Sequence, residues 1–326
     1  MKCSPPEPDS PVPPQRVILV HKGALGDFLQ VWPSLLALTR QWPETAFFWA
    51  GREDVSLWTE PLGIRPCPGT LKRLVNTLYS AGERPEGLAT ALVIWFGLRK
   101  RPFARSFPGV WFVRGLGEGF PAVSASPPRE LYARGLAQLG VGQCRDWIQA
   151  WRRLIKAWNP DSRDSRRALL FPGAGNRKKC WPVEQFQALG EWLGARGWAV
   201  TCVYGPAEKE RGVRVKNFEP AFPDDFQALQ RLLVQADLVV GNDCGPLHLA
   251  GYLGVPGLAL FGPADPKQWG PYGIKTVSRH LPCSPCTELG EVACSDPVCL
   301  RELSLERVQE AAAEVLSNGS ACLEAK

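Results

Sequence analysis

The sequence has no long hydrophobic run. Among its 326 residues no segment approaches the roughly 18 consecutive apolar residues of a membrane-spanning helix, so we expect none. Residues 1–15, MKCSPPEPDSPVPPQ, are rich in proline and lack an apolar centre, which predicts a disordered tail and argues against a signal peptide. The eleven cysteines therefore predict reduced thiols or a metal site, not a secreted disulfide framework, and a cytoplasmic protein.

The sequence also lacks the marks of a nucleic-acid-binding protein. Its net charge of +6, from 38 basic and 32 acidic residues, is too diffuse for that partner, and neither an aromatic-rich RNA motif nor zinc-finger spacing is present. A mildly basic chain suits an anionic ligand or a membrane surface instead. With 45% hydrophobic and 21% charged residues, the chain has the composition of ordinary folded domains.

Strand-like and helix-like segments alternate along the chain, which predicts an α/β protein with parallel sheets. The predicted strands are residues 16–20, 46–50, 91–97, 110–115, 167–173, 198–205, 237–242 and 255–262. The predicted helices follow the first strand and cover residues 128–141, 182–197, 224–236 and 245–254. Trp147, Trp151 and Trp158 recur at helical spacing, and the polar segment after them predicts a domain boundary. We therefore expect two doubly wound domains, at 16–160 and 161–326, after the tail at 1–15.

The segment VILVHKGALGDFLQ, residues 17–30, predicts a buried strand, a turn and the start of a helix. Gly23 and Gly26 permit a tight turn, and Asp27 lies where the helix begins. The apolar face of this helix is expected to comprise Val31, Leu35 and Leu38. Two interpretations of the aspartate are open. With Gln30 three residues later, Asp27 can form a capping box, or its carboxylate can face a substrate.

A candidate anion site lies in LLFPGAGNRKKCWPVEQF, residues 169–186. A strand leads through a small-residue loop, with Lys178 and Lys179, into a helix opened by Pro182. Free backbone N–H groups and the positive end of the helix dipole favour an anion there. The segment matches neither the Walker pattern nor the dinucleotide fingerprint, so a solvated basic loop is the alternative.

A second candidate loop is VVGNDCGPLHLAG, residues 239–251. Asn242, Asp243 and Gly245 lie between a strand and a helix, and His248 lies within that helix. Carboxylate and imidazole groups at a strand end can bind the oxygens of a hydroxyl-rich ligand. The alternative is that Asp243 caps the helix and His248 is a satisfied core histidine.

Four ordered motifs together resemble one known family. GALGDFLQVWPSL, PGAGNRKKCWPVEQF, YGPAEKE and GNDCGPLHLAGYLGVPGLALFGPADPKQWGPYG are similar to the motifs of glycosyltransferase family nine, the ADP-heptose:lipopolysaccharide heptosyltransferases and their relatives. The resemblance spans most of residues 17–273. It implies a GT-B fold, in which two Rossmann-like domains face each other across a cleft, with the acceptor site on the first and the nucleotide-sugar on the second. It also implies inverting transfer with no required metal or other cofactor, and the chain has no Asp-x-Asp triplet.

The resemblance also implies roles for individual residues. Asp27 matches the family's proposed general base at the acceptor hydroxyl. The donor-binding residues that it implies are Lys179 at the diphosphate, Glu208 at the nucleoside ribose, Asp243 near the donor sugar, the motif histidine His248, and Gly245 and Pro246, whose backbone approaches the diphosphate. No metal ligand is among them.

These motifs predict an inverting glycosyltransferase that moves a heptose or related sugar from ADP-heptose to a lipopolysaccharide inner-core acceptor. Its partners are then a nucleotide-sugar and a lipid-linked saccharide, with peripheral contact at the cytoplasmic face of the inner membrane and no nucleic acid. Two alternatives stay open: a relative with another nucleotide-sugar or a protein acceptor, and a sugar-nucleotide-binding module without turnover. A dinucleotide-dependent dehydrogenase is excluded because GALGDF does not supply the Gly-x-Gly-x-x-Gly turn.

Two further clusters lie outside these motifs. Cys283, Cys286, Cys294 and Cys299 fall in one short loop, where they form either a tetrahedral structural zinc site or reduced free thiols. LRKRPFAR, residues 98–105, is either a solvated loop or a patch that attracts acceptor phosphates and anionic lipids.

Overall fold

The computed structural model describes residues 13–78, 84–99, 106–117, 126–155, 166–279, 281–287, 292 and 294–323. The chain divides into two compact units, Met1–Ala150 and Trp151–Lys326, and the division falls inside helix α5 (Trp147–Leu154). The expected boundary between residues 160 and 161, Trp158 and most of the predicted N-terminal tail lie outside the described residues. Within the described ranges, no helix has both the length and the apolar character that crossing a bilayer requires.

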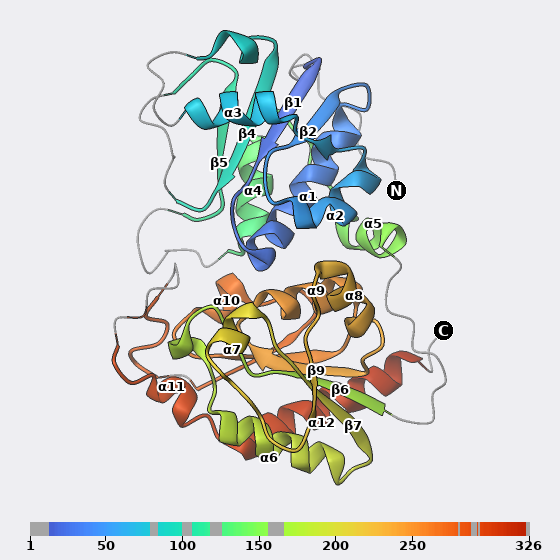
Figure 1. Ribbon diagram of the computed structural model, residues 1–326, viewed down its shortest axis with the longest axis vertical. Coiled ribbons are helices and arrows are strands. Elements are labelled where there is room, and N and C mark those ends of the chain that lie inside the picture. The colour runs from blue at the N-terminus through green and yellow to red at the C-terminus, as the bar shows by residue number, and fades with distance from the viewer. Residues whose placement is uncertain are drawn as a thin grey trace. The chain divides into compact units, whose positions relative to one another are not determined.

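A parallel sheet forms the centre of the first unit (Figure 1). In the described residues its strand order is β3-β2-β1-β4-β5. The strands are β1 (Arg16–Val20), β2 (Ala46–Trp49), β3 (Arg65–Pro66), β4 (Ala91–Gly97) and β5 (Val110–Arg114). Residues 17–20 of β1 are 0% exposed, because this central strand pairs with β2 and β4 and is covered on both faces. The strands predicted for this half are confirmed, and β3 is an additional short one.

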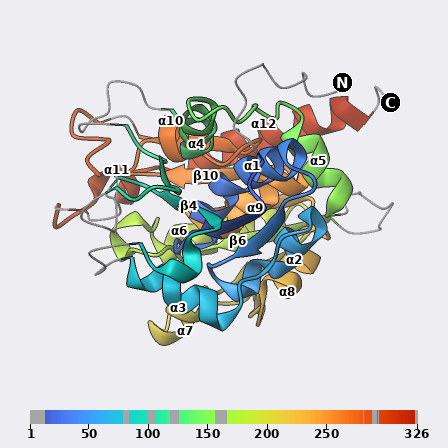
Figure 2. The same cartoon turned by 90° about the horizontal axis from the view of Figure 1, so that it is seen from above.

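The helices of the first unit include α1, which follows β1 directly. They are α1 (Leu25–Gln41), α2 (Ser56–Thr59), α3 (Gly69–Thr77) and α4 (Pro128–Ala137), with short 3-10 turns at Glu53–Val55, Glu60–Leu62 and Glu86–Leu88. The predicted apolar face of α1 is buried, since Val31, Leu35 and Leu38 are each 0% exposed. Helix α1 packs against α4, and the two lie side by side in both views (Figures 1 and 2).

A second parallel sheet forms the centre of the other unit. In the described residues its order is β11-β10-β9-β6-β7-β8. The strands are β6 (Arg166–Phe171), β7 (Trp198–Val203), β8 (Glu219–Ala221), β9 (Leu238–Asn242), β10 (Gly257–Phe261) and β11 (Lys275–Ser278). The helices are α6 (Val183–Gly194), α7 (Pro206–Glu210), α8 (Phe226–Leu233), α9 (Gly245–Leu253), α10 (Pro266–Trp269), α11 (Val298–Arg301) and α12 (Leu305–Leu323). The strands and helices predicted here are confirmed, and α12 is an additional helix at the end of the described residues.

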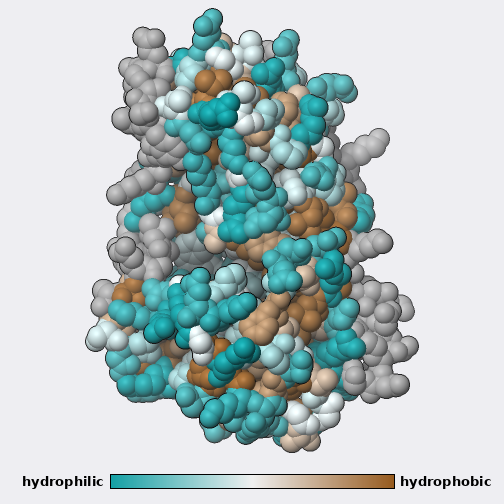
Figure 3. Space-filling view, in the orientation of Figure 1, coloured by the Kyte–Doolittle hydropathy of each residue, from teal (hydrophilic) through white to brown (hydrophobic). Residues whose placement is uncertain are grey.

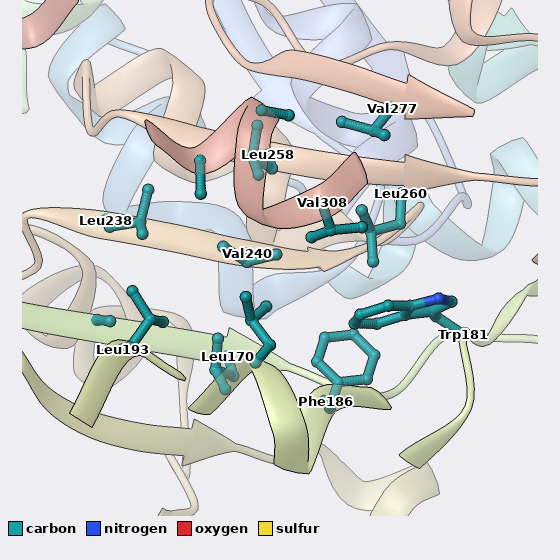
Figure 4. Packing of buried hydrophobic residues seen from close by; sticks show 14 of the residues in the cluster. Leu170, Trp181, Phe186, Leu193, Leu238, Val240, Leu258, Leu260, Val277 and Val308 are labelled. Atoms are coloured by element: carbon teal, nitrogen blue, oxygen red, sulfur yellow. The ribbon is translucent and has the colours of Figure 1, made fainter. Parts of the chain in front are cut away.

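The core of the second unit lies between its sheet and helices α6 and α12, which neighbour each other below the sheet in Figure 1. Figure 4 shows Leu170, Val240 and Leu260 from three neighbouring strands within this core. The rings of Trp181 and Phe186 meet edge to face with centroids 5.1 Å apart. Replacing a buried aromatic of this kind by alanine typically costs about 3–5 kcal/mol. The loop after β6 is therefore anchored through Trp181 in the hydrophobic core.

Helix α5 carries two of the tryptophans that recur at helical spacing. Trp151 is 0% exposed and packs edge to face against Tyr252 of α9, with ring centroids 5.1 Å apart. Arg152 Nε donates a hydrogen bond to the Tyr252 carbonyl oxygen at 3.2 Å, near the C-terminal end of α9, where a cation is favourable. Trp151 is thus a packing residue.

The arrangement of the sheets predicts where ligands bind. Because all strands of each sheet run parallel, their carboxyl ends lie at one edge, and the loops after β1, β6 and β9 begin there. On the face shown in Figure 3, hydrophilic and hydrophobic residues are interspersed. Exposed large hydrophobic side chains among the described residues include Leu154, Phe222 and Tyr272, which come from different segments and need no functional explanation.

Candidate active site

Asp27 lies in the first turn of α1, at the carboxyl end of β1. The helix begins at Leu25, so Asp27 is its third residue and not its N-cap. Its Oδ2 accepts a hydrogen bond from the Ala24 N–H at 3.1 Å. Gln30 is instead buried, and its Oε1 accepts from the backbone N–H of Arg129 at 3.3 Å. The predicted capping box of Asp27 with Gln30 is therefore wrong, because the helix starts earlier than its sequence pattern indicates and Asp27 caps it from the third position.

His21 lies directly beside this aspartate. It follows β1 and is 4% exposed, and burial lowers its pKa to about 4, so the imidazole is neutral at pH 7. A Cβ on Gly23 would lie 2.6 Å from Asp27 Cβ and 2.6 Å from His21 Cε1. One carbon atom placed at Gly23 would thus touch both side chains. Only glycine fits there, which explains the first glycine of the turn.

Two more titratable groups of this unit are Lys22, next to His21 in the sequence, and Tyr132. Lys22 Nζ donates to Asn76 Oδ1 at 3.1 Å and lies 5.6 Å from the centroid of the Trp95 ring. Tyr132, on α4, is 0% exposed, and its pKa is raised first by burial and then by the negative charge of Asp27, so the phenol stays neutral. Sequence reasoning gave no role to His21 or Tyr132, although a histidine at the end of a buried strand was a visible signal.

Lys179 and Asp243 form an ion pair in the second unit. Lys179 ends a 3-10 turn, Arg177–Lys179, in the loop after β6, and Asp243 follows β9. Lys179 Nζ lies 3.0 Å from Asp243 Oδ2, and the two side chains are only 18% and 13% exposed. Adjacent strands β6 and β9 bring these distant segments together, as the parallel-sheet prediction required. Removing one partner of such a pair leaves a poorly solvated charge, which is strongly destabilising.

Asn242 joins the same two loops through its side chain. It is 0% exposed at the end of β9. Its Oδ1 accepts a hydrogen bond from the Trp181 N–H at 2.8 Å, and its Nδ2 donates to the Pro172 carbonyl oxygen at 2.9 Å. These bonds hold the backbone on either side of the Lys179 turn. Sequence reasoning assigned no role to Asn242, but an amide at the end of an apolar strand was the available signal.

Glu208 is buried over the end of β6. It is 9% exposed, and its Oε2 accepts a hydrogen bond from the Gly205 N–H at 2.9 Å, so it caps α7 as Asp27 caps α1. A Cβ on Gly173 would lie 2.1 Å from Glu208 Cδ. Arg211, just after α7, donates to the carbonyl oxygen of Ala174 at 3.0 Å. The structure therefore places Glu208 against the same loop that carries Lys179.

We expect Gly173→Ala to displace Glu208, because the added methyl group overlaps its carboxyl carbon. Overpacking of this kind costs about 1–3 kcal/mol, so affinity for an adenine nucleotide should fall about tenfold if Glu208 binds it. Calorimetric titration with ADP measures the change. Gly175→Ala is the matched control in the same loop, because a Cβ there meets nothing within 4 Å. Equal affinities of the two variants would contradict the role of Glu208.

Helix α9 supplies the remaining predicted residues. Gly245 and Pro246 are its first two residues, so their segment presents the Gly245 N–H and the positive dipole end of a helix, while proline supplies no N–H. Gly241 lets this helix approach the sheet, since a Cβ there would lie 2.8 Å from Leu247 Cδ2 of α9. His248 is 4% exposed on the buried side of α9. Backbone N–H groups from α9 and the Lys179 ammonium thus both lie at the strand ends where a diphosphate could bind.

The four cysteines of the predicted zinc loop are all among the described residues. All four side chains are free thiols, exposed at Cys283 and Cys294, half-buried at Cys286 and buried at Cys299. Burial, followed by the neighbouring thiols, raises the pKa of Cys286 and Cys299. In the described part of the chain, which includes all four, no three His, Cys, Asp or Glu side chains are arranged to hold a metal ion. A structural zinc ion at these four cysteines stays a prediction.

The basic segment 98–105 is described only up to Arg99, which is half-buried. Residues 100–105 lie outside the described residues. Attraction of this segment to anionic lipids or acceptor phosphates stays a prediction.

Comparison with known proteins identifies the class. The family model "Glycosyltransferase family 9 (heptosyltransferase)" matches residues 150–293. Lipopolysaccharide heptosyltransferase 1 of Escherichia coli strain K12 is 32% identical over 302 residues, covering 82% of this chain and 94% of that protein. Lipopolysaccharide heptosyltransferase 1 of Pseudomonas aeruginosa is 28% identical over 344 residues, covering 90% of this chain and 96% of that protein.

The fold agrees with this relationship. The structure of E. coli heptosyltransferase WaaC with ADP superposes with a TM-score of 0.60 at 18% identity, covering 92% of this chain and 99% of that one. Two Rossmann-like units with these sheet orders define a GT-B glycosyltransferase. The chain belongs to glycosyltransferase family 9. The membership of this family that the four motifs predicted is confirmed.

Proposed function

We propose that the chain is an inverting heptosyltransferase that transfers a heptose from ADP-heptose to a lipopolysaccharide inner-core acceptor. The observation that carries this proposal is the match along nearly the whole chain to lipopolysaccharide heptosyltransferase 1 of E. coli, 94% of which is covered. Local agreement within a nucleotide-binding domain alone would support only donor binding. A match over both units supports the same reaction.

Asp27 is the proposed general base. In an inverting transfer the acceptor hydroxyl oxygen attacks the anomeric carbon of the donor as the bond from that carbon to the diphosphate oxygen breaks. The hydroxyl proton passes to a carboxylate oxygen of Asp27, and the electron pair of the broken bond leaves with ADP. The half-buried position of Asp27 at the carboxyl end of β1 suits this role.

The second unit supplies the proposed donor residues. The Lys179 ammonium and the positive end of helix α9, with the N–H of Gly245, stabilise the negative charge that gathers on the departing diphosphate, while Pro246, which has no N–H, opens the helix. Glu208 holds the nucleoside through ribose hydroxyls, and Asp243 lies near the donor sugar, where it also orients Lys179 through their 3.0 Å contact. His248 supports the start of α9 from its buried side.

The proposed transfer requires no metal ion, since Lys179 and backbone N–H groups supply the positive charge. The acceptor is a lipid-linked saccharide at the cytoplasmic face of the inner membrane, with peripheral membrane contact and no nucleic-acid partner. Two alternatives remain as outcomes of experiment. One is a relative with another nucleotide-sugar or a protein acceptor, and the other is a non-catalytic sugar-nucleotide-binding module.

Calorimetric titration of the full chain with ADP-, UDP- and GDP-sugars tests the donor assignment. We expect ADP-heptose to bind at least about tenfold more tightly than the other two classes. Glu208→Ala should weaken binding of ADP-heptose about tenfold or more, because a hydrogen bond to a charged group contributes about 1.5–3 kcal/mol. Glu210→Ala, which changes an exposed glutamate of the same helix, is the control. Equal affinity for all three classes would refute ADP-heptose as the donor.

A further inference from the structure

His21 is the buried titratable group closest to the proposed base. It lies at the carboxyl end of β1, six positions before Asp27, with 4% of its surface exposed. A Cβ on Gly23 would lie 2.6 Å from His21 Cε1, 2.8 Å from His21 Nε2 and 2.6 Å from Asp27 Cβ. The Nε2 edge of the ring, and not its Nδ1 edge, therefore faces the space beside the aspartate.

The protonation state of His21 suits a donor to this carboxylate. Burial lowers its pKa to about 4, so the ring is neutral throughout the range in which a carboxylate base is ionised. A neutral imidazole has one N–H donor and one acceptor nitrogen. A donor at Nε2 can bond an oxygen of Asp27 without placing a second full charge in the buried space.

The Asp27 carboxylate needs such a partner in order to act as a base. Its Oδ2 accepts a hydrogen bond from Ala24 N–H, an interaction that orients the carboxylate along the helix end. To take a proton from an acceptor hydroxyl, one oxygen must point away from the helix, and the carboxylate must be held in that orientation.

We propose that His21 is a positioning residue for Asp27: its Nε2–H donates a hydrogen bond to the carboxylate and holds one oxygen toward the acceptor hydroxyl. This inference rests on the proposed function. His21 keeps its proton throughout, and the acceptor proton passes to Asp27 alone. Two other titratable groups of this unit are Lys22, which donates to Asn76, and Tyr132 on α4, whose phenol is neutral. Neither shares the Gly23 contact that joins His21 to Asp27.

The matched variants His21→Gln and His21→Asn test this role. A glutamine amide reaches the position of Nε2, whereas an asparagine amide reaches only that of Nδ1. Both remove the imidazole and reduce its volume, so a purely structural role affects them alike. For His21→Asn we expect kcat to fall by on the order of 10- to 100-fold with KM for donor and acceptor nearly unchanged. For His21→Gln we expect kcat within a few-fold of the wild-type value.

The pH dependence of kcat/KM gives a second readout. Loss of a donor to the ionised base disfavours the charged form, so the acidic limb should move to higher pH in His21→Asn and stay in place in His21→Gln. The ring centroids of Trp49 and His21 lie 6.5 Å apart, and the Trp49 side chain is uncharged. The control variant Trp49→Phe should therefore leave the acidic limb of the pH profile unchanged.

The possible results separate this inference from the proposed function. Wild-type kcat and pH profile in both histidine variants would overturn it, and so would equal losses in both. If the wild-type chain transfers no sugar, the proposed function fails. If the wild-type chain is active, Asp27→Asn is inactive and His21→Asn behaves as wild type, only the role of His21 fails.

Discussion

Replacing Asp27 by asparagine is expected to lower kcat for sugar transfer by about 10²–10⁴-fold, the usual contribution of a positioned general base. The affinity for ADP-heptose should stay nearly unchanged, because the proposed donor residues belong to the second unit. Asparagine keeps the side-chain oxygen that accepts from Ala24 N–H, so the helix cap survives. Steady-state kinetics and calorimetric titration measure the two effects separately.

Asp54→Asn is the matched control for this result. Asp54 is an exposed aspartate of the same unit, paired with Arg52 at the surface, and its loss should change kcat by less than about twofold. If Asp27→Asn keeps wild-type kcat, Asp27 is a helix cap and not the base. Because Asp27 Oδ2 accepts a hydrogen bond from the Ala24 N–H, a capping role is the alternative, and the measured kcat distinguishes the two roles.

Replacing Lys179 by methionine is expected to lower kcat/KM by about 10²–10³-fold, because a cation at the departing diphosphate is lost. It should also lower thermal stability, since the Asp243 carboxylate, only 13% exposed, loses its partner at 3.0 Å. A second substitution, Asp243→Asn, should restore part of the stability and none of the activity. Kinetics and thermal melting of the single and double variants check these outcomes.

Lys178→Met removes the same charge from the same loop and is the control for Lys179. Lys178 Nζ donates to the Val292 carbonyl oxygen at 2.8 Å and has no contact with Asp243. We expect its effect on kcat/KM to be at least tenfold smaller. Similar losses in the two variants would show that the loop acts through its general charge and not through a particular lysine.

The main elements of the fold could be predicted from the sequence because each strand is a short apolar run that ends at glycine or a polar residue. Residues 17–20, 91–97 and 257–261 are examples, and all are central strands whose burial demands such runs. The edge strands β3 and β8 were not predicted. Arg65–Pro66 and Glu219–Ala221 are short and largely exposed, so their sequences carry no apolar pattern.

The sequence could predict that certain residues far apart along the chain meet at the strand ends of the candidate site. Lys179 and Asp243 come together because β6 and β9 are neighbours, which a doubly wound order allows one to expect. The contacts that depend on three-dimensional packing were not predictable. The position of Glu208 over Gly173 and that of His21 beside Asp27 follow from where the backbone turns, and no local pattern encodes either.

The proposed reaction couples the loss of ADP to the transfer of a sugar. The most direct test measures released ADP and radiolabelled lipid in one reaction that contains the chain, labelled ADP-heptose and a lipid-linked inner-core saccharide. We expect equal amounts of released ADP and labelled lipid, and we expect both to form only when the acceptor is present. Tight donor binding with no label in the lipid would contradict it.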